Sequence, residues 1–253
     1  MAKKINDIKA ELQAATYEML PFFMKEYAED ERAGVKALVR RAEQEIKKKE
    51  AELERLHVMR TYERQYDMCQ YICGIDEAGR GPLAGPVVAG AVILPKDAQI
   101  LYLNDSKKLS AAKREELYEE IKEKAVAVGV GIVSPQRIDE INILQATYEA
   151  MRIAIKELKR TPDILLNDAV TIPGVEIGQV PIIKGDAKSV SIAAASIVAK
   201  VTRDKIMLEY DKMYPEYGFA GHKGYGSAAH IEAIKTYGAS PIHRKTFIKN
   251  FTD

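Results

Sequence analysis

A mixed β-sheet covered by helices, and hence an α/β fold, is what most of this 253-residue sequence predicts. Two short apolar runs come first after residue 70, and further short runs then alternate with longer segments whose apolar residues have helical spacing. Residues 1–65 have a different composition, rich in Glu, Lys, Ala and Leu, with Gly34 as their one glycine. We therefore expect a helical N-terminal extension over residues 1–68 and an α/β domain over residues 69–253.

The extension is expected to contain two helices. Ile8, Leu12 and Met19 fit one face of the first helix, and Pro21 interrupts that pattern. The second helix is expected over residues 35–56, but its apolar positions do not sustain the several heptads of a long coiled coil. Two roles stay open for this unit: an appendage packed on the domain, or an arm that grips substrate or a partner.

The elements of the domain follow from β-branched runs, apolar stripes and turn residues. The five expected strands are residues 71–76, 87–94, 126–133, 164–166 and 180–183. The expected helices are residues 111–125, with Ser110 as the N-cap, and residues 141–159, 189–213 and 227–237. Pro135 is assigned to a short turn and the glycine- and tyrosine-rich residues 214–226 to a loop.

The bulk composition excludes few functions. The net charge is +1, so any basic surface that binds nucleic acid must be local and offset by acids elsewhere. Two cysteines, Cys69 and Cys73, have no second pair and no adjacent histidine, which favours reduced thiols over a zinc site. No apolar run reaches the roughly 20 residues that span a bilayer, and the N-terminus lacks a secretory pattern, so we expect a cytoplasmic protein without a membrane partner.

Residues 73–90 contain the most informative motif, an acidic pair followed by a glycine loop. Asp76 and Glu77 end an apolar run, and Gly79, Arg80 and Gly81 follow them. Adjacent strand residues point to opposite faces, so we expect the strand to end near Asp76 if both acids serve one site. A cation held by these acids beside an exposed backbone suits a phosphate group.

Two more acids lie at expected element boundaries: Asp168 at the end of a short strand and Asp186 between a strand and a helix. Each acid taken alone is equally explained as a helix cap or a turn residue. Four converging carboxylates would repel one another, and divalent cations relieve that repulsion. Oxygen-only ligands suit Mg²⁺ or Mn²⁺, and two such ions about 4 Å apart stabilise both oxygens of an in-line phosphoryl displacement.

The acidic pair with its glycine loop closely resembles the signature of bacterial ribonuclease HII, the type 2 ribonuclease H. The resemblance continues through residues 105–110, 184–186, 189–204, 223–226 and 243–247, and covers roughly residues 71–250. It implies a ribonuclease H fold with a five-stranded mixed sheet and a helical C-terminal part. It also implies an endonuclease that uses two Mn²⁺ or Mg²⁺ ions and leaves a 3′-hydroxyl and a 5′-phosphate. The implied substrates are the RNA strand of RNA–DNA hybrids and single ribonucleotides in duplex DNA, cut on their 5′ side during ribonucleotide removal.

The resemblance also assigns residues. Its four acidic metal ligands, which are the catalytic residues, correspond to Asp76, Glu77, Asp168 and Asp186. The loop of Gly79, Arg80 and Gly81 corresponds to the one that hydrogen-bonds the 2′-hydroxyl, and Tyr225 to the tyrosine that packs on the sugar. Positive charge for duplex phosphates is expected from Lys107, Lys108, Lys184, Lys188, Lys223, Arg244 and Lys245. Each of these, without the resemblance, is equally explained as a turn, packing or surface residue.

Some residues carry no assigned chemistry. His222, His230 and His243 lack metal-ligand spacing and are assigned to the surface or to the surroundings of the site. Residues 247–251, with an aromatic at each end, suit a docked terminus better than a tail that binds a sliding clamp. A monomer is expected.

Two alternative functions remain at this point. One is the sister enzyme ribonuclease HIII, which needs several consecutive ribonucleotides; the intact glycine loop and the helical N-terminus argue against it. The other is a non-catalytic module that binds RNA–DNA hybrids, and the complete acidic set argues against that.

Overall fold

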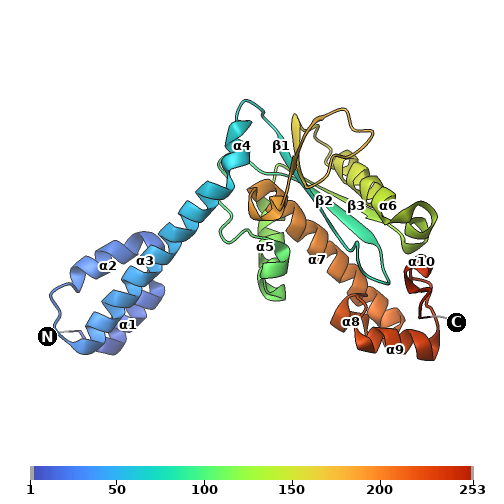
Figure 1. Cartoon of the computed structure of the whole chain (residues 1–253). Coiled ribbons are helices and arrows are strands. Elements are labelled where there is room, and N and C mark those ends of the chain that lie inside the picture. The colour runs from blue at the N-terminus through green and yellow to red at the C-terminus, as the bar shows by residue number, and fades with distance from the viewer. Residues whose placement is uncertain (1–2, 252–253) are drawn as a thin grey trace. The chain divides into compact units, whose positions relative to one another are not determined.

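The computed structural model describes residues 3–251, and the chain forms two compact units that divide between His57 and Val58 (Figure 1). The first unit contains α1 (Ile5–Ala14), η1 (Tyr17–Met19), α2 (Leu20–Glu26) and most of α3 (Ala33–Met59). Ile8 and Leu12 of α1 are buried in a small core of this unit, as the pattern predicts. Met19 is 55% exposed, so its assignment to that face is wrong. Pro21 lies in the first turn of α2, where its missing N–H costs no helical hydrogen bond.

The second unit is built on a five-stranded mixed sheet, as predicted. Its strands are β1 (Ile72–Ala78), β2 (Val87–Ile93), β3 (Ala127–Val133), β4 (Ile164–Asp168) and β5 (Gly178–Ile182). Their order across the sheet is β3-β2-β1-β4-β5. The first three strands pair antiparallel, whereas β1 with β4 and β4 with β5 pair parallel. The carboxyl ends of β1 and β4 therefore lie at the same edge of the sheet.

Long helices cover the two faces of the sheet (Figure 1). One face packs through Ile75 and its neighbours against α6 (Pro135–Glu157) in the main apolar core. The other face packs against α7 (Val190–Met213), and glycines in the strands let this helix approach closely. A Cβ on Gly90 would lie 2.5 Å from the carbonyl oxygen of Ala195. The alanine-rich start of α7 is thus a packing feature that brings the helix against the middle of the sheet.

Other helices of this unit include α4 (Thr61–Gln65), α5 (Ala111–Lys124), α9 (Ala228–Tyr237) and α10 (Lys245–Ile248), with η2 (Ser106–Lys108) and η3 (Gly185–Ala187). Two expectations are wrong. Pro135 begins α6, capped by Ser134, instead of forming a turn; Asn142, at φ 67°, marks a kink within that helix. Residues 214–226 are partly helical, with η4 (Pro215–Tyr217) and α8 (Phe219–His222). Within residues 3–251, no helix is long and apolar enough to cross a membrane.

Candidate metal centre and substrate cleft

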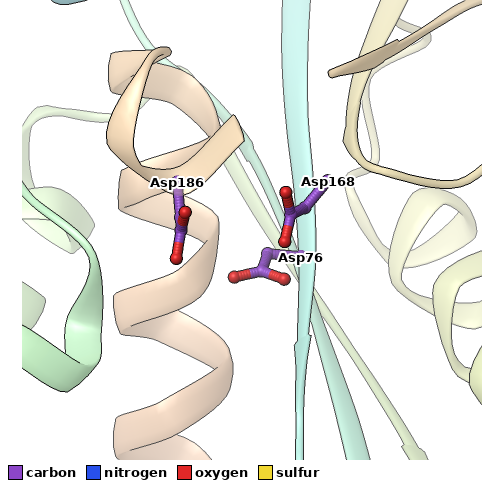
Figure 2. Close-up of side chains that lie close together, drawn as sticks. All are labelled: Asp76, Asp168 and Asp186. Atoms are coloured by element: carbon purple, nitrogen blue, oxygen red, sulfur yellow. The ribbon is translucent and has the colours of Figure 1, made fainter. Parts of the chain in front are cut away.

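Three of the four predicted acids meet at one edge of the sheet. Asp76 lies on β1, Asp168 ends β4, and Asp186 lies in η3 just before α7. One carboxylate oxygen from each lies within 4.8 Å of the others. Figure 2 shows the three carboxylates grouped between the strands and the helix. The parallel pairing of β1 with β4 brings the first two together, because Ile75 and Asn167 are partners in the register.

A hydrogen bond fixes the third acid relative to the second. The N–H of Gly185 donates to Asp168 Oδ1 at 2.7 Å and so ties η3 to the end of β4. A Cβ on Gly185 would lie 2.5 Å from Ile192 Cδ1, so a larger residue here would require the end of the Ile192 side chain to move. The Lys-Gly-Asp sequence therefore places Asp186 by a turn rather than by a strand.

The electrostatics of the group are those of crowded carboxylates. Burial, reinforced by the adjacent Glu77, raises the pKa of Asp76 well above its usual range. Burial, together with Asp105 and Asp168, also raises the pKa of Asp186. Such a group keeps its full negative charge only if a cation compensates it, and otherwise takes up a proton more readily.

The donor set fits a hard divalent cation. All three groups offer carboxylate oxygen, and neither a histidine nor a cysteine belongs to the cluster. Oxygen ligands suit Mg²⁺ and Mn²⁺, whereas structural zinc sites use sulfur and nitrogen. Asp76, Asp168 and Asp186 are therefore the residues that would hold such an ion.

Glu77 is placed differently from the expectation. β1 continues through Glu77 to Ala78, with Glu77 opposite Ala89 of β2, so the expected strand end near Asp76 is wrong. Glu77 lies outside the cluster of three carboxylates, and its Oε1 accepts from Arg80 Nη1 at 3.3 Å. Burial nevertheless raises the pKa of Glu77, although Arg80 opposes that shift. Its carboxylate lies beside the cluster rather than inside it.

A cleft joins the acids to the glycine loop. Five of the predicted substrate-binding residues line it, together with α7 residues that the sequence did not single out. The lining residues are Asp76, Glu77, Ala78, Gly79, Arg80, Gly81, Ser106, Lys107, Ser196, Lys200 and Tyr225. Lys188 does not line this cleft; it follows η3, where its N–H donates to the carbonyl of Gly185 at 2.9 Å.

The fold requires a glycine at position 79 of the loop but not at position 81. Gly79 has φ 93°, and a Cβ there would lie 2.1 Å from Arg203 Nε, so the fold itself requires this glycine. Gly81 has no positive φ, and a Cβ there would find only Tyr225 Cε1, at 4.0 Å. The fold does not require a glycine at position 81, and its missing Cβ leaves open space beside Tyr225.

Lys107 supplies positive charge at the mouth of this cleft. Burial opposes that charge, but Asp105, Asp76 and the other acids of the cluster outweigh burial and raise the pKa of Lys107. The side chain is therefore held as a cation beside the carboxylates.

Two buried arginines hold the glycine loop and the residues after it, a role that the sequence does not reveal. Arg244 was expected to contact duplex phosphates, but it is fully buried, so that expectation is wrong. Its guanidinium donates to the carbonyls of Gly79, Arg80 and Gly85 at 2.5–3.0 Å. Burial lowers the pKa of Arg244 to about 9. Arg203 is likewise buried, and donates to the carbonyls of Ala84, Pro86 and Lys223.

Two of the histidines are buried. His230 and His243 are 0% and 3% exposed, so of the two expected positions they take the one in the surroundings of the site and not the one on the surface. Phe247 packs against the main core, and the guanidinium of Arg244 lies 5.1 Å from the centre of its ring. The segment around α10 is docked on the domain at that residue.

Comparison with known proteins matches both parts of the chain. A family model described as Ribonuclease HII matches residues 73–250, and one described as Ribonuclease HII N-terminal domain matches residues 4–67. A protein named Ribonuclease HII from Lachnoclostridium phytofermentans is 61% identical over 249 residues, covering 98% of this chain and 98% of that protein.

Solved structures give the same result. The crystal structure of ribonuclease H2 from Pyrococcus horikoshii OT3 matches with a TM-score of 0.60 and 30% identity, covering 72% of this chain and 96% of that one. A chain from the PCNA:RNase HII complex of Archaeoglobus fulgidus matches with a TM-score of 0.59 and 29% identity, covering 72% and 97%.

Proposed function

Because this chain belongs to the ribonuclease HII family, and is therefore a metal-dependent ribonuclease H, we propose that it cuts single ribonucleotides in duplex DNA on their 5′ side. It also cleaves the RNA strand of RNA–DNA hybrids, and both reactions leave a 3′-hydroxyl and a 5′-phosphate. One observation carries the proposal: Gly81 and Tyr225 line the same cleft as Asp76, and the cleft is open beside Gly81. A sugar held in that space would lie next to the carboxylates.

The carboxylates of Asp76, Asp168 and Asp186, with Glu77 beside them, would hold two divalent cations, Mn²⁺ or Mg²⁺. Bound there, such ions supply the nucleophile at neutral pH and stabilise the oxygens of the displacement. The proximity of the three aspartates and the raised pKa values of Asp76 and Asp186 support this assignment. Lys107 adds a fixed cation for the phosphate that enters the cleft.

The glycine loop and Tyr225 would distinguish RNA from DNA. Only RNA offers a 2′-hydroxyl, which can donate and accept a hydrogen bond. The main chain of residues 79–81 can reach that hydroxyl because Gly81 presents no Cβ, and the half-exposed ring of Tyr225 packs on the neighbouring sugar. Arg80 and Lys188 contact the backbone phosphates. A DNA nucleotide lacks the hydroxyl and leaves the loop's polar groups unpaired, which disfavours its binding.

The cellular role proposed is the removal of ribonucleotides from DNA in the cytoplasm, by a monomer. Ribonuclease HIII-type activity is disfavoured because a ribonuclease HII model matches residues 73–250, and because the extension is helical. Recruitment by a sliding clamp, suggested by the PCNA:RNase HII complex of Archaeoglobus fulgidus, is a weaker proposal because Phe247 is packed against the core.

Three duplexes of one sequence test the function: one with a single ribonucleotide, one all DNA, and one RNA–DNA hybrid, each with Mn²⁺ or Mg²⁺. We expect cleavage of the first on the 5′ side of the ribonucleotide, cleavage of the hybrid, and no cleavage of DNA. Cleavage of the hybrid alone would indicate ribonuclease HIII-type activity. If the protein binds the hybrid but cuts neither substrate, it is a binding module and the proposal is wrong.

A further inference from the structure

His230 and His243 form a buried pair beside the substrate cleft, and the chemistry above does not use them. Their Nε2 atoms lie 3.0 Å apart. At one end of the pair, His230 Nδ1 lies 2.9 Å from the carbonyl oxygen of Tyr225. At the other end, the N–H of Ser240 donates to His243 Nδ1 at 2.9 Å. The two rings thus connect the turn before α10 to the residue that lines the cleft.

The backbone groups at the two ends of this chain of hydrogen bonds determine which nitrogen of each ring carries the proton. A backbone N–H can only donate, so His243 Nδ1 carries no proton, and a neutral His243 has its proton on Nε2. That proton is donated to His230 Nε2. The proton of a neutral His230 is then on Nδ1, where it donates to the carbonyl of Tyr225, which can only accept. Every donor has an acceptor when both rings are neutral.

We propose that this pair is a relay that positions Tyr225 for substrate binding, a role that rests on the function proposed above for Tyr225. His230 and His243 act through the main chain of Tyr225 and do not touch the substrate. Tyr225 remains 46% exposed, and its ring lies beside the open space at Gly81. The relay therefore fixes the backbone of this residue and leaves its ring available to the sugar.

A third histidine holds the other side of the same loop. The N–H of Gly224 donates to His222 Nδ1 at 3.1 Å, so the proton of a neutral His222 is on Nε2, which donates to the carbonyl of Tyr217 at 2.8 Å. The rings of His222 and His230 stack, with centroids 4.3 Å apart and planes at 15°. Gly224 and Tyr225 are thus each held by one imidazole.

The surroundings keep the pair neutral. The groups that face the two rings are His222 and Phe219 of α8, Tyr217 of η4, and Ser240. Arg244, the next residue after His243, directs its guanidinium to backbone carbonyls. Within residues 3–251, neither ring forms an ion pair with a carboxylate that would favour its protonation. Burial lowers the pKa of His230, and burial with the adjacent His230 lowers that of His243 to about 4.

Two substitutions of His230 distinguish the proposed hydrogen-bond relay from a role in packing alone. An Asn amide reaches about as far as Nδ1 of His, whereas a Gln amide reaches about as far as Nε2. His230→Asn therefore keeps a donor for Tyr225, and His230→Gln keeps only the contact with His243. For the single-ribonucleotide duplex, we expect His230→Gln to raise KM roughly tenfold, the effect of one buried hydrogen bond, with kcat within about twofold. His230→Asn should stay within about threefold of the wild-type KM.

Repeating both substitutions in Tyr225→Ala tests whether the relay acts through that residue. We expect His230→Gln to add nothing to the KM of Tyr225→Ala. The relay is refuted if His230→Gln raises KM by the same factor in both backgrounds, or if it lowers kcat and leaves KM unchanged, because a general loss of structure would do either.

Nitrogen NMR of histidine-labelled wild-type protein tests the relay without any cleavage. We expect His230 as the Nδ1–H tautomer, His243 as the Nε2–H tautomer, and a pKa below the ordinary value of about 6.5 for both rings, with that of His243 at about 4. The opposite tautomers, or titration near the ordinary value, would overturn the relay. Failure of the wild-type protein to cut the single-ribonucleotide duplex would instead refute the proposed function, and the NMR result would still decide whether the relay exists.

Discussion

The acidic edge of the cleft and the glycine loop beside it are stabilised in opposite ways. At the acidic edge, Asp76, Asp168 and Asp186 crowd like charges together, and burial raises the pKa values of Asp76 and Asp186. At the loop, Arg203 and Arg244 bury two cations, but their hydrogen bonds go to neutral backbone carbonyls. The acidic edge thus depends on a cation from solution, whereas the loop is held by cations of the protein itself. Substitutions at the edge should remove activity and spare stability, whereas substitutions of Arg244 or Gly79, which hold the loop in place, should lower stability.

The largest expected effect is on activity, at the acidic edge. Asp76→Asn should lower kcat/KM by roughly 10³-fold or more, since it removes a charged ligand from the proposed metal centre. Without added metal, the same variant should have a slightly higher free energy of unfolding, by about 1 kcal/mol, because it removes a buried charge from a repulsive group. Cleavage assays and urea denaturation in chelator measure the two effects.

The exposed Asp97→Asn is the matched control, and neither activity nor stability should change. A metal-free Asp76→Asn that is less stable than wild type by more than about 1 kcal/mol would contradict the comparison between edge and loop.

The largest expected effect on stability is at the loop. Arg244→Met should lower the free energy of unfolding by about 3 kcal/mol, because several buried carbonyls lose their donors. Arg244→Lys should recover little of this, since an ammonium cannot reproduce the guanidinium fork. Urea denaturation measures the loss, and Arg137→Met, at an exposed ion pair with Glu140 and Glu149, should change by less than about 1 kcal/mol. Equal losses at the two positions would refute the role assigned to Arg244.

A smaller loss is expected from one glycine of the loop and not from the other. Gly79→Ala should cost about 2 kcal/mol, because its φ of 93° is strained for alanine and the added Cβ collides with Arg203. Gly81→Ala should change stability by no more than about 0.5 kcal/mol. Thermal unfolding of the two variants compares them directly, and a stable Gly79→Ala would show that the loop is not held as described.

The smallest effect is the pH dependence of metal binding. Raised pKa values mean that Asp76, Glu77 and Asp186 are harder to ionise in the folded chain than in the unfolded chain. Their ionisation therefore lowers the stability of the metal-free protein as pH rises, and acid relieves this as pH falls through those pKa values. A bound cation stabilises the ionised carboxylates and so offsets the stability that their ionisation costs. Because more of the acids are ionised at pH 8, Mn²⁺ should raise Tm by about 2–4 °C at pH 8 and less at pH 5. An equal or larger shift at pH 5 would contradict the crowded-carboxylate account, and Asp76→Asn is the control.

The positions of Asp76 and Asp168 were predictable from the sequence because each acid follows an apolar run that marks its strand. Asp76 and Asp168 follow short apolar runs in their strands, and parallel strands next to each other end at one edge, so their convergence follows from chain pattern and topology. The position of Glu77 was not predictable in the same way. β1 continues through Glu77 because this residue pairs with Ala89 of β2, and the residues next to Glu77 in sequence do not reveal that pairing.

The loop supports were not predictable because their partners are distant in sequence. Arg244 reads as a surface cation beside other basic residues, yet its acceptors are backbone carbonyls at Gly79 and Gly85. A carbonyl has no sequence signature, so only the fold shows which cation it receives. His230 and His243 present the same difficulty, since each ring is bonded to a backbone group and to the other ring.

The most direct test of the central claim, that the open space at Gly81 receives the ribonucleotide's sugar, is the cleavage of a single-ribonucleotide duplex by Gly81→Ala. The Gly81→Ala variant should fold as the wild type does, so any change in kcat/KM reports on substrate binding and not on stability. We expect kcat/KM to fall by about 10–100-fold, with an unfolding free energy like that of wild type. Wild-type cleavage by a folded Gly81→Ala would contradict the claim that this space reads the sugar.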